Sequence, residues 1–521
     1  MKKFKYLFFS CVLTIALSLI ANGCSSTTKD NNATDKNQSE QVLRVARDWE
    51  NTNMDPATWS THTDLCFGPN VFETLLAYDN DLNPSPKLAE KWEMSSDGLT
   101  YRFFLKKGVQ FHKNYGEMKA SDVVFTIERM KDPAVKATAN GPSLGIDNMK
   151  EVTAEDDYTV KIVLKKEDPI FLYRFCEAYC YVISEKAVKE MGLEDFAKHP
   201  IGTGPFEFDK GIGGEKTEIV KNDKYWGEKA KLDRIIFNII SEPSILFNAF
   251  ESGEIDFTSL SDSNKIVEYK NKPNFIVHAV PTRYTGNLGM NTQIKPFDDI
   301  KVRQAVACAI NREEIVNNYF LGLEKAPDSI IPPGAKYAVK DNFKPEFNPE
   351  KAKKLLAEAG YPNGFETEIY CPNDQISMGP TTLIQSYLSQ VGINAVSKTV
   401  DFGVFLSTAR AGKAPLWYLC DGPEVIPDAW FERFTSSKAP GSNWSCFKDI
   451  EYDDYVKQAL QARNENDKAK FYALAQQRLV EQLPFIPINT SGAFYAMNKK
   501  IKGFEIKPNL IFTYEKIYIE E

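Results

Sequence analysis

Few residue spacings in this chain could support catalysis. Gly141–Gly145 has the GxSxG pattern of a serine nucleophile, but no buried strand precedes it and no helix pattern follows, so we predict a loop. The glycine-rich segment from Gly211 lacks the adjacent Gly-Lys of a phosphate-binding loop. Carboxylate pairs such as Asp156-Asp157 and Asp453-Asp454 lie in polar turns. HExxH, paired CxxC and dinucleotide motifs do not occur, so we predict neither an enzyme nor a cofactor.

Metal-binding and disulfide-forming residues are also sparse. The histidines are widely scattered, and we predict no metal site from them; they are His62, His112, His199 and His278. Beyond Cys11 and Cys24, seven cysteines remain, an odd number without regular spacing, which is not typical of a disulfide framework. Cys176 and Cys180 are one helical turn apart, which favours a buried face over a bridge. At most one or two disulfides are plausible, and the sequence does not assign them.

Cys24 is the cysteine with a defined candidate role. Three lysines within the first five residues precede an uncharged, mostly apolar run over residues 6–21, which is typical of a secretory signal. A cysteine directly after the cleavage site resembles bacterial lipoprotein signals, although Ala21 and Asn22 depart from the preferred residues there. We therefore expect residues 1–23 to be a lipoprotein signal peptide and Cys24 the lipidated residue. The alternative is an ordinary secretory signal followed by a chance cysteine.

The next segment and the net charge fit an exported chain. Residues 24–40 contain almost nothing apolar and predict a disordered tether that reaches ~20–25 Å. Removing residues 1–23, which carry three lysines and no acidic residue, changes the formal net charge from −8 to −11. An acidic chain without a basic block is unsuited to nucleic acid. We expect a protein anchored on the outer face of the cell membrane, or in the periplasmic space where an outer membrane exists.

Strands and helices alternate over the remaining 480 or so residues, which are too many for one core and predict two or three lobes. Alternating apolar residues predict strands at 41–47, 100–106 and 159–165, and a more continuous apolar run predicts a strand at 232–240. Helices are expected at 302–320 and 467–483, and from Asn348 as cap to Gly360 as stop, with Glu350 paired to Lys354. The predicted class is mixed α/β.

Seven segments, in order, resemble the family 5 solute-binding proteins of ABC importers, the oligopeptide-, dipeptide- and nickel-binding group. The first runs from Leu88 (LAEKWEMSSDGLTYRFFLKKGVQFHKNYGEMKASDVVFTIERM). The others are IGTGPF from Ile201, NDKYWGEKAKLDRI from Asn222, FESGEIDF from Phe250, LGMNTQIKPFDDIKVRQAVACAINR from Leu288, PEKAKKLLAEAGY from Pro349 and PFIPI from Pro484. Any one segment is weak, but seven in order are specific.

The resemblance implies a two-lobed type II periplasmic-binding-protein-like fold with an inserted third lobe (cluster C, family 5). Lobe I would comprise residues 41–71, 199–280 and 490–521. Lobe II would be the insertion at 72–198, and lobe III would be 281–489. Trp92, Tyr101, Phe103, Phe111 and Phe125 would belong to the core of lobe II.

The resemblance also implies a function. Such proteins capture short peptides by hinge closure and deliver them to an ABC permease, while a separate subunit hydrolyses ATP. We expect a monomer. The same fold also serves relatives that bind a nickel chelate, an oligosaccharide or an opine-like amine, which stay as alternatives. A receptor that only signals is a further alternative, and a secreted surface enzyme is a distant one.

Peptide-binding relatives grip the N-terminal ammonium of the ligand with a carboxylate that lies shortly before a proline. Here Glu424 is the first candidate, Asp421 the second and Asp428 the third, and the tryptophan usually found three residues before the acid is missing. By the same resemblance, Phe402 would line a side-chain pocket and Arg410 would lie near the peptide carboxylate. Further residues expected near the ligand are Tyr284, Trp417 and Trp430.

Overall fold

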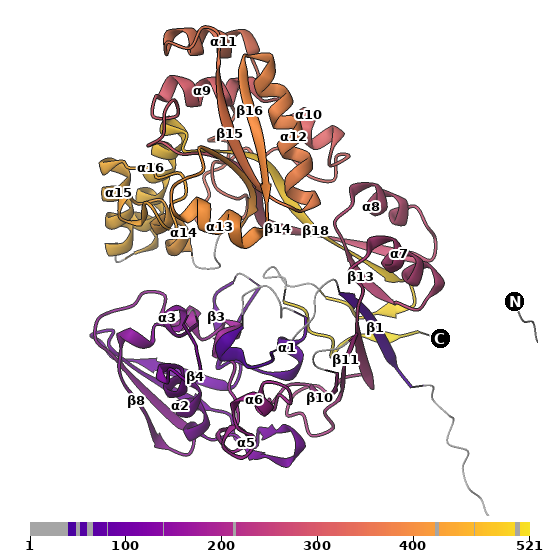
Figure 1. The fold of residues 1–521 in the computed structure, drawn as a ribbon. Helices are drawn as coiled ribbons and strands as arrows, with labels where there is room; N and C mark the ends of the chain where they lie inside the picture. The colour runs from indigo at the N-terminus through magenta and orange to yellow at the C-terminus, as the bar shows by residue number, and fades with distance from the viewer. Residues whose placement is uncertain are drawn as a thin grey trace, which may run out of the picture. The chain divides into compact units, whose positions relative to one another are not determined.

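The computed structural model describes residues 40–47, 53–59, 66–80, 82–138, 140–211, 215–422, 427–462, 464–505 and 511–520, without the side chains of residues 281 and 283. Residues 40–521 form one compact unit (Figure 1). The predicted signal peptide, Cys24 and residues 24–39 of the predicted tether lie outside the described residues. Among the residues that are described, no helix is long and apolar enough to cross a membrane.

A ten-stranded mixed sheet joins segments from the whole chain. Its strands, in spatial order, are β10 (Phe206–Lys210), β11 (Lys216–Lys221), β12 (Arg234–Ile239), β1 (Val42–Arg47), β13 (Phe257–Leu260), β18 (Phe485–Asn498), β14 (Phe275–Met290), β17 (Leu416–Asp421), β15 (Phe365–Pro372) and β16 (Ile393–Val400). β1 is parallel to β12 and β13, and β15 is parallel to β16 and β17. The central pairs β13–β18, β18–β14 and β14–β17 are antiparallel.

β14 and β18 are the long strands at the centre of this sheet. They pair from Phe275 with Asn498 to Gly289 with Phe485, and the register shifts between Pro281 and Thr285 and again between Gly286 and Asn287. Figure 1 shows the two strands side by side, and we call this strand pair the β14–β18 ribbon. One end packs in a hydrophobic cluster with Phe250 and Tyr269, and the other end packs in a cluster with Leu356 and Tyr452.

A separate four-stranded antiparallel sheet lies within residues 89–164. Its order is β4 (Ala89–Met94), β5 (Thr100–Leu105), β9 (Thr159–Leu164) and β8 (Met149–Asp156). Tyr101, Phe103 and Leu105 point to one buried face because side chains alternate along a strand. Phe171 packs there with its ring centroid 4.5 Å from that of Tyr101. The predicted core residues Tyr101, Phe103 and Phe111 are buried, and Trp92 and Phe125 are partly buried against the same cluster.

The remaining strands form three small pairs: β2 (Leu76–Tyr78) with β3 (Pro84–Pro86), β6 (Gln110–Phe111) with β7 (Gly116–Glu117), and β19 (Ile501–Lys502) with β20 (Tyr518–Ile519). In the described part of the first 270 residues, the α-helices are α1 (Gly68–Val71), α2 (Ala120–Glu128), α3 (Asn140–Leu144), α4 (Phe171–Arg174), α5 (Glu185–Met191), α6 (Leu193–Phe196), α7 (Pro243–Ser252) and α8 (Ser263–Lys270). Single 3-10 turns occur at Pro56–Thr58, His112–Asn114, Arg129–Lys131, Ile146–Asn148, Ala178–Cys180 and Ser436–Lys438.

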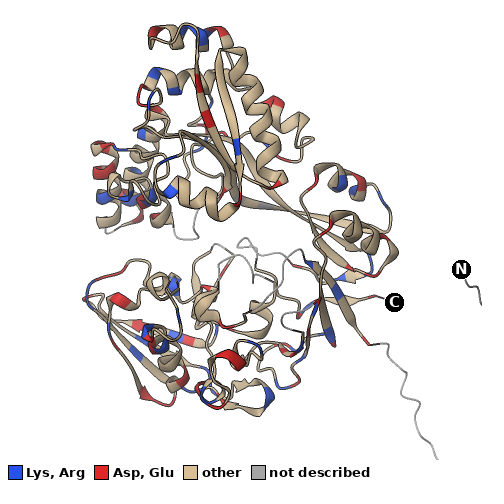
Figure 2. Ribbon diagram, viewed as in Figure 1, with Lys and Arg blue, Asp and Glu red and all other residues tan. Residues whose placement is uncertain are grey.

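Eight α-helices follow among the residues described between 300 and 482: α9 (Ile300–Ala309), α10 (Arg312–Asn318), α11 (Pro349–Glu358), α12 (Gln375–Gln390), α13 (Phe402–Arg410), α14 (Pro427–Arg433), α15 (Ile450–Gln461) and α16 (Glu465–Gln482). Most begin at an Asp or Asn cap, such as Asp374, Asp401, Asp449 and Asn464, whose side chain accepts a backbone N–H of the first turn. In the view of Figure 2, basic and acidic residues are interspersed along these helices, as expected for solvated surfaces.

Several sequence predictions are confirmed. Strands occupy residues 42–47, 100–105 and 159–164 within the predicted ranges. Asn348 caps α11 by accepting the Lys351 N–H, with Pro349 at the first position. No disulfide joins any two of the described cysteines, which are at positions 66, 176, 180, 308, 371, 420 and 446.

Other predictions about elements were wrong. The helix expected at 302–320 is two helices, because Ile310 is extended and Asn311 starts α10 as its cap. Residues 140–144 form a short helix where we expected a loop. The strand expected at 232–240 spans only residues 234–239, and its burial alternates along the chain. Glu350 pairs with Lys353 and not with Lys354.

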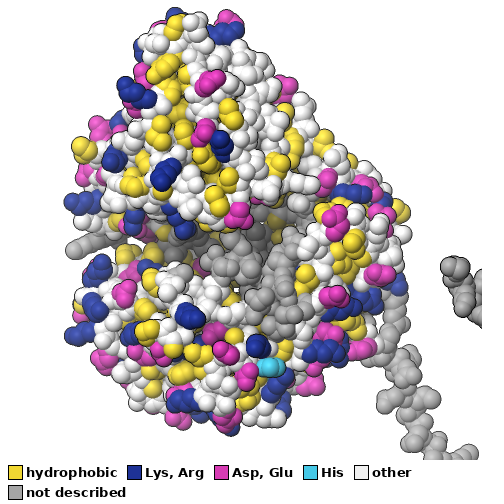
Figure 3. All heavy atoms as spheres, viewed as in Figure 1, with side chains coloured by type: hydrophobic (Ala, Val, Ile, Leu, Met, Phe, Trp, Pro, Cys, Tyr) yellow, Lys and Arg dark blue, Asp and Glu magenta, His cyan; other side chains and the backbone are white. Residues whose placement is uncertain are grey.

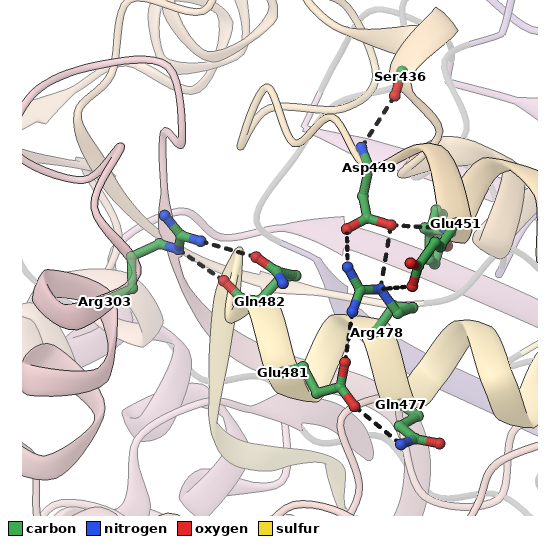
Figure 4. Close-up of polar contacts among 9 residues, drawn as sticks. Arg303, Ser436, Asp449, Glu451, Gln477, Arg478, Glu481 and Gln482 are labelled. Atoms are coloured by element: carbon green, nitrogen blue, oxygen red, sulfur yellow. Dashed lines mark hydrogen bonds and ion pairs between the residues drawn. The ribbon is translucent and has the colours of Figure 1, made fainter.

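Arg303 is a buried cation that joins α9 to the end of α16 (Figure 4). Its side chain is 4% exposed, and its Nε donates a hydrogen bond to the Gln482 carbonyl at 2.7 Å. Nη1 donates to the Phe297 carbonyl at 2.8 Å. The last carbonyls of a helix have no partner within the helix, so Arg303 satisfies a group that burial would otherwise leave unpaired. Burial lowers the pKa of Arg303 to about 10, which still keeps it charged at neutral pH.

We predict that Arg303→Met lowers the free energy of unfolding by at least about 1–3 kcal/mol, because buried carbonyls lose their donor. Urea denaturation measures the change. The matched control is Arg478→Met in the neighbouring network of Figure 4, where the side chain of Arg478 is 21% exposed and bonds to Asp449 and Glu481. Water can replace part of those bonds, so we expect a loss of about 1 kcal/mol or less. Equal losses for the two variants would contradict this account of Arg303.

Candidate ligand-binding site

Two of the predicted site residues, Trp417 and Asp421, belong to β17, which lies beside β14 in the central sheet. Trp417 of β17 pairs with Gly289 of β14, and Asp421 at the end of β17 pairs with Thr285. The first four residues of β17 are buried and its last two are half-buried. The strand therefore runs from the core to a partly exposed end, and that end carries Asp421.

Asp421 forms an ion pair with Arg433 of α14. Nη1 of Arg433 donates a hydrogen bond to Oδ2 of Asp421, and the two side chains are 24% and 16% exposed for Asp421 and Arg433. The Arg433 guanidinium also lies 4.4 Å from the ring centroid of Trp444. Within the described part of the chain, Oδ1 of Asp421 accepts no hydrogen bond. The pair presents one acceptor and one cation together, which suits a ligand that carries both an ammonium and a carboxylate.

Tyr284 lies next to this pair. Its ring covers Gly422, where a Cβ atom would lie 3.0 Å from ring carbons of Tyr284. Burial, and then the negative charge of Asp421, raises the pKa of the Tyr284 hydroxyl. The structure therefore brings together Asp421 and Tyr284, two of the residues that the sequence singled out.

The two tryptophans among the candidates lie in the hydrophobic core. Trp417 is 2% exposed and packs on Gly289, where a Cβ atom would lie only 1.9 Å from the indole. Trp430 is 6% exposed and packs against Phe434, with a ring-centroid distance of 4.8 Å. Such burial favours packing over contact with a ligand.

Asp428 is also buried, within α14. Its Oδ2 accepts a hydrogen bond from Nζ of Lys468 at 2.7 Å, and its Oδ1 accepts one from the Tyr472 hydroxyl. Burial, and then Asp428, raises the pKa of Tyr472. Both oxygens of the carboxylate therefore have donors from α16, which favours a role in holding α14 to α16.

Phe402 and Arg410 lie at opposite ends of α13. Phe402 is the first residue of the helix and is 48% exposed. Arg410 is the last residue and is also exposed. Eight residues of helix separate them by ~12 Å along the axis, so one small ligand group cannot touch both backbones.

Glu424, our first candidate for the ammonium-binding acid, lies outside the described residues and stays a prediction. Arg433 and Trp444 are not among the residues that the sequence patterns indicate. Arg433 lies twelve residues beyond Asp421 and belongs to the next described helix, α14. No spacing rule in the sequence marks such a pair. In the residues that can be described, no group of three or more His, Cys, Asp or Glu is placed to hold a metal ion.

We predict that Asp428→Asn lowers the free energy of unfolding by about 1–3 kcal/mol, because the amide nitrogen meets a donor where the carboxylate accepted one. Thermal or urea denaturation tests this. The control is Asp454→Asn on α15, because Asp454 is exposed and accepts a hydrogen bond from Gln458, and we expect a change within about 0.5 kcal/mol. Unchanged stability of Asp428→Asn together with lost ligand affinity would instead make Asp428 a ligand residue.

Comparison with known proteins agrees with this architecture. Residues 83–442 match the family described as bacterial extracellular solute-binding proteins, family 5 (middle). The chain is 30% identical to the dipeptide-binding protein of Escherichia coli K12 over 87% of this chain and 92% of that protein. The structure of DppA, an ABC transporter-associated periplasmic binding protein from Helicobacter pylori in complex with the peptide STSA, is 27% identical and covers 92% of this chain and 98% of its own, with a TM-score of 0.79. NikZ from Campylobacter jejuni in complex with Ni(L-His) is 25% identical and covers 92% and 100%, with a TM-score of 0.75.

These similarities confirm the predicted fold class, a mixed α/β, two-lobed type II fold. The family is a substrate-binding component of transporters and not an enzyme, which confirms that prediction and removes the surface-enzyme alternative. Its members work outside the cytoplasm. The chain belongs to the bacterial extracellular solute-binding proteins of family 5.

Proposed function

We propose that the chain is the lipid-anchored substrate-binding subunit of an ABC importer and that it captures short peptides by hinge closure. One observation carries the proposal: Asp421 lies at the end of β17, with Tyr284 beside it, next to the paired strands β14 and β18. A carboxylate at that point can receive the ammonium of a peptide, and strands that cross between two lobes can bend.

The ligand class is supported by charge and by the relatives. A short peptide carries an N-terminal ammonium, and Asp421 offers it a carboxylate that is partly exposed. A carboxylate attracts the ammonium and repels the peptide's own carboxylate, so it fixes which end of the peptide it accepts. The dipeptide-binding protein of E. coli and the H. pylori protein with its peptide support the same ligand class. Glu424, next in sequence, is a second proposed acid.

The anchor and the lobes are part of the same proposal. Diacylation of Cys24 would supply the two acyl chains that stable membrane attachment requires, and residues 24–40 would leave the folded part free to reorient. We propose lobe I at 41–71, 199–280 and 490–521, lobe II at 72–198 and lobe III at 281–489. A closed, loaded, monomeric form would then be the one that the permease accepts.

A thermal-shift assay of residues 25–521 tests the ligand class. We expect di- to pentapeptides to raise the melting temperature and the same peptides with acetylated N-termini to have little effect. A peptide at about 100 times its Kd adds about 2.7 kcal/mol to the stability of the folded state, which is readily measured. Ni²⁺-histidine, oligosaccharides and an opine serve as competing ligand classes.

Two variants make the assay specific. Asp421→Asn and Glu424→Gln each remove one candidate carboxylate, and the one that holds the ammonium should weaken affinity by about 10- to 100-fold, the value of a hydrogen bond to a charged group. Asp454→Asn, on an exposed face of α15, is the control and should leave affinity unchanged. Stabilisation by the nickel chelate, a sugar or an opine, with no response to any peptide, would refute the peptide proposal and keep the fold.

A further inference from the structure

The segment after α10 brings the carboxylate of Glu324 against strand β18. Oε2 of Glu324 accepts a hydrogen bond from Nδ2 of Asn489 at 2.6 Å, and the backbone N–H of Gly492 donates a second one to the Glu324 carboxylate. Both donors belong to β18. Asn489 is fully buried, so its amide must find its partners within the protein.

The hydrogen bonds continue from Asn489 to β17. The Tyr418 hydroxyl donates to Oδ1 of Asn489 at 2.7 Å, and Tyr418 is fully buried. Gly286 of β14 lies against both groups, because a Cβ atom there would lie 2.0 Å from Asn489 Oδ1 and 2.2 Å from the Tyr418 oxygen. Glu324, Asn489 and Tyr418 therefore form one chain of hydrogen bonds, the hinge relay, and Gly286 leaves the space for it.

The hinge relay lies where the β14–β18 ribbon is irregular. Asn489 pairs with Gly286, and the register shifts at the next residue of β14. Thr490 donates its N–H to the Lys325 carbonyl at 2.7 Å, and the Lys325 N–H donates to Oγ1 of Thr490 at 3.1 Å. These reciprocal bonds fasten the segment that carries Glu324 to β18 at the irregular point.

The hinge relay and its neighbours reach the hydrophobic clusters at both ends of the ribbon. Leu323, next to Glu324, packs against the hydrophobic cluster that contains Phe250 and Tyr269. Tyr418 belongs to the cluster at the other end, with Phe485. A bend of the ribbon would therefore strain the hinge relay, because its members are held by different clusters.

The surroundings of Glu324 disfavour its negative charge. The titratable groups on which Glu324 acts are Tyr418 and Cys420 of β17 and Tyr319 after α10, and none of these three is a cation. Burial raises the pKa of Glu324 to about 7, against the lowering effect of its two hydrogen-bond donors. The acid is thus partly neutral near physiological pH.

We propose that the hinge relay of Glu324, Asn489 and Tyr418 is a proton-dependent lock on the β14–β18 hinge. The inference rests on the hinge closure proposed above. In the conformation described here, Glu324 is half-buried and holds its proton beside Asn489. A bend that parts Thr490 from Lys325 hydrates Glu324 further, so that it ionises and releases one proton, and hinge motion and proton release are coupled.

The direction of the pH effect follows from the two pKa values. The pKa of about 7 in this conformation lies above the ordinary value of 4.5, so proton binding favours this conformation. The stabilisation is complete below about pH 4.5 and is lost as the pH rises through about 7. If bending hydrates Glu324 fully, the equilibrium constant between the bent conformation and the one described here changes about 30-fold between pH 5.5 and 8.5.

Hydrogen exchange of the ligand-free chain, residues 25–521, tests the lock. We expect the β14 and β18 amides near Gly286 and Asn489 to be up to about 30-fold less protected at pH 8.5 than at pH 5.5, after correction for intrinsic exchange. Glu324→Gln imitates the neutral acid, so its protection at both pH values should equal that of the unmodified chain at pH 5.5. Glu207→Gln, which removes another carboxyl whose pKa burial raises, lies on the edge strand β10 and should leave the pH response unchanged.

Equal protection of the unmodified chain at the two pH values would overturn the lock, and so would a full pH response in Glu324→Gln. Should Glu324→Gln fail to fold, infrared titration of the unmodified chain decides: a protonated carboxyl band lost with a midpoint near pH 7 supports the lock, and no carboxyl titrating between pH 6 and 8 overturns it. These measurements need no ligand. Failure of peptides to bind would therefore refute the proposed ligand class without deciding the lock.

Discussion

The antiparallel pairing of β14 with β18 is the constraint on which the rest of the structure depends. Two chain segments that are separated by about 200 residues run together from one hydrophobic cluster to another, and their hydrogen bonds hold both clusters to one sheet. Strands on either side, β13 and β17, attach to this ribbon and not to each other. Asp421 and Tyr284, two of the candidate ligand residues, lie at this ribbon because β17 pairs with β14.

Close backbone approach makes this ribbon possible. Trp417 occupies the space above Gly289, and Tyr418 and Asn489 occupy the space above Gly286. A methyl group at either glycine would collide with a buried side chain, so the two glycines allow large residues of β17 to pack directly on β14. This packing supports the partly exposed end of β17, where Asp421 lies, and the Tyr284 ring of β14 packs beside it on Gly422. On the face shown in Figure 3, apolar side chains at the surface are interspersed with charged ones.

The buried and half-buried charged groups differ in the partners that compensate their charge. The partners distinguish groups that only hold the fold together from groups that can respond to conformation or to a ligand. Arg303 is surrounded by carbonyl acceptors, and Asp428 has a lysine and a tyrosine as donors, so each is held in one place and joins two helices. Glu324 has only neutral donors, so its charge stays unfavourable and its protonation responds to conformation. Asp421 has a cation but remains partly exposed, so it can exchange part of that interaction for a ligand.

Local rules in the sequence determined the element types, the caps and the buried faces of strands such as Thr100–Leu105, because they depend on neighbours two to four residues away. The ordered motifs also determined the family and the fold class. Only the tertiary structure decided which candidates share a site. Arg433 meets Asp421, Asp428 turns inward to α16, and Glu324 reaches Asn489 across 165 positions. The break at Ile310 likewise escaped the apolar pattern, which continues through it, because the cap at Asn311 competes with helix continuation. A side chain's burial and partners are set by elements distant in the chain, and periodicity within one segment carries no information about them.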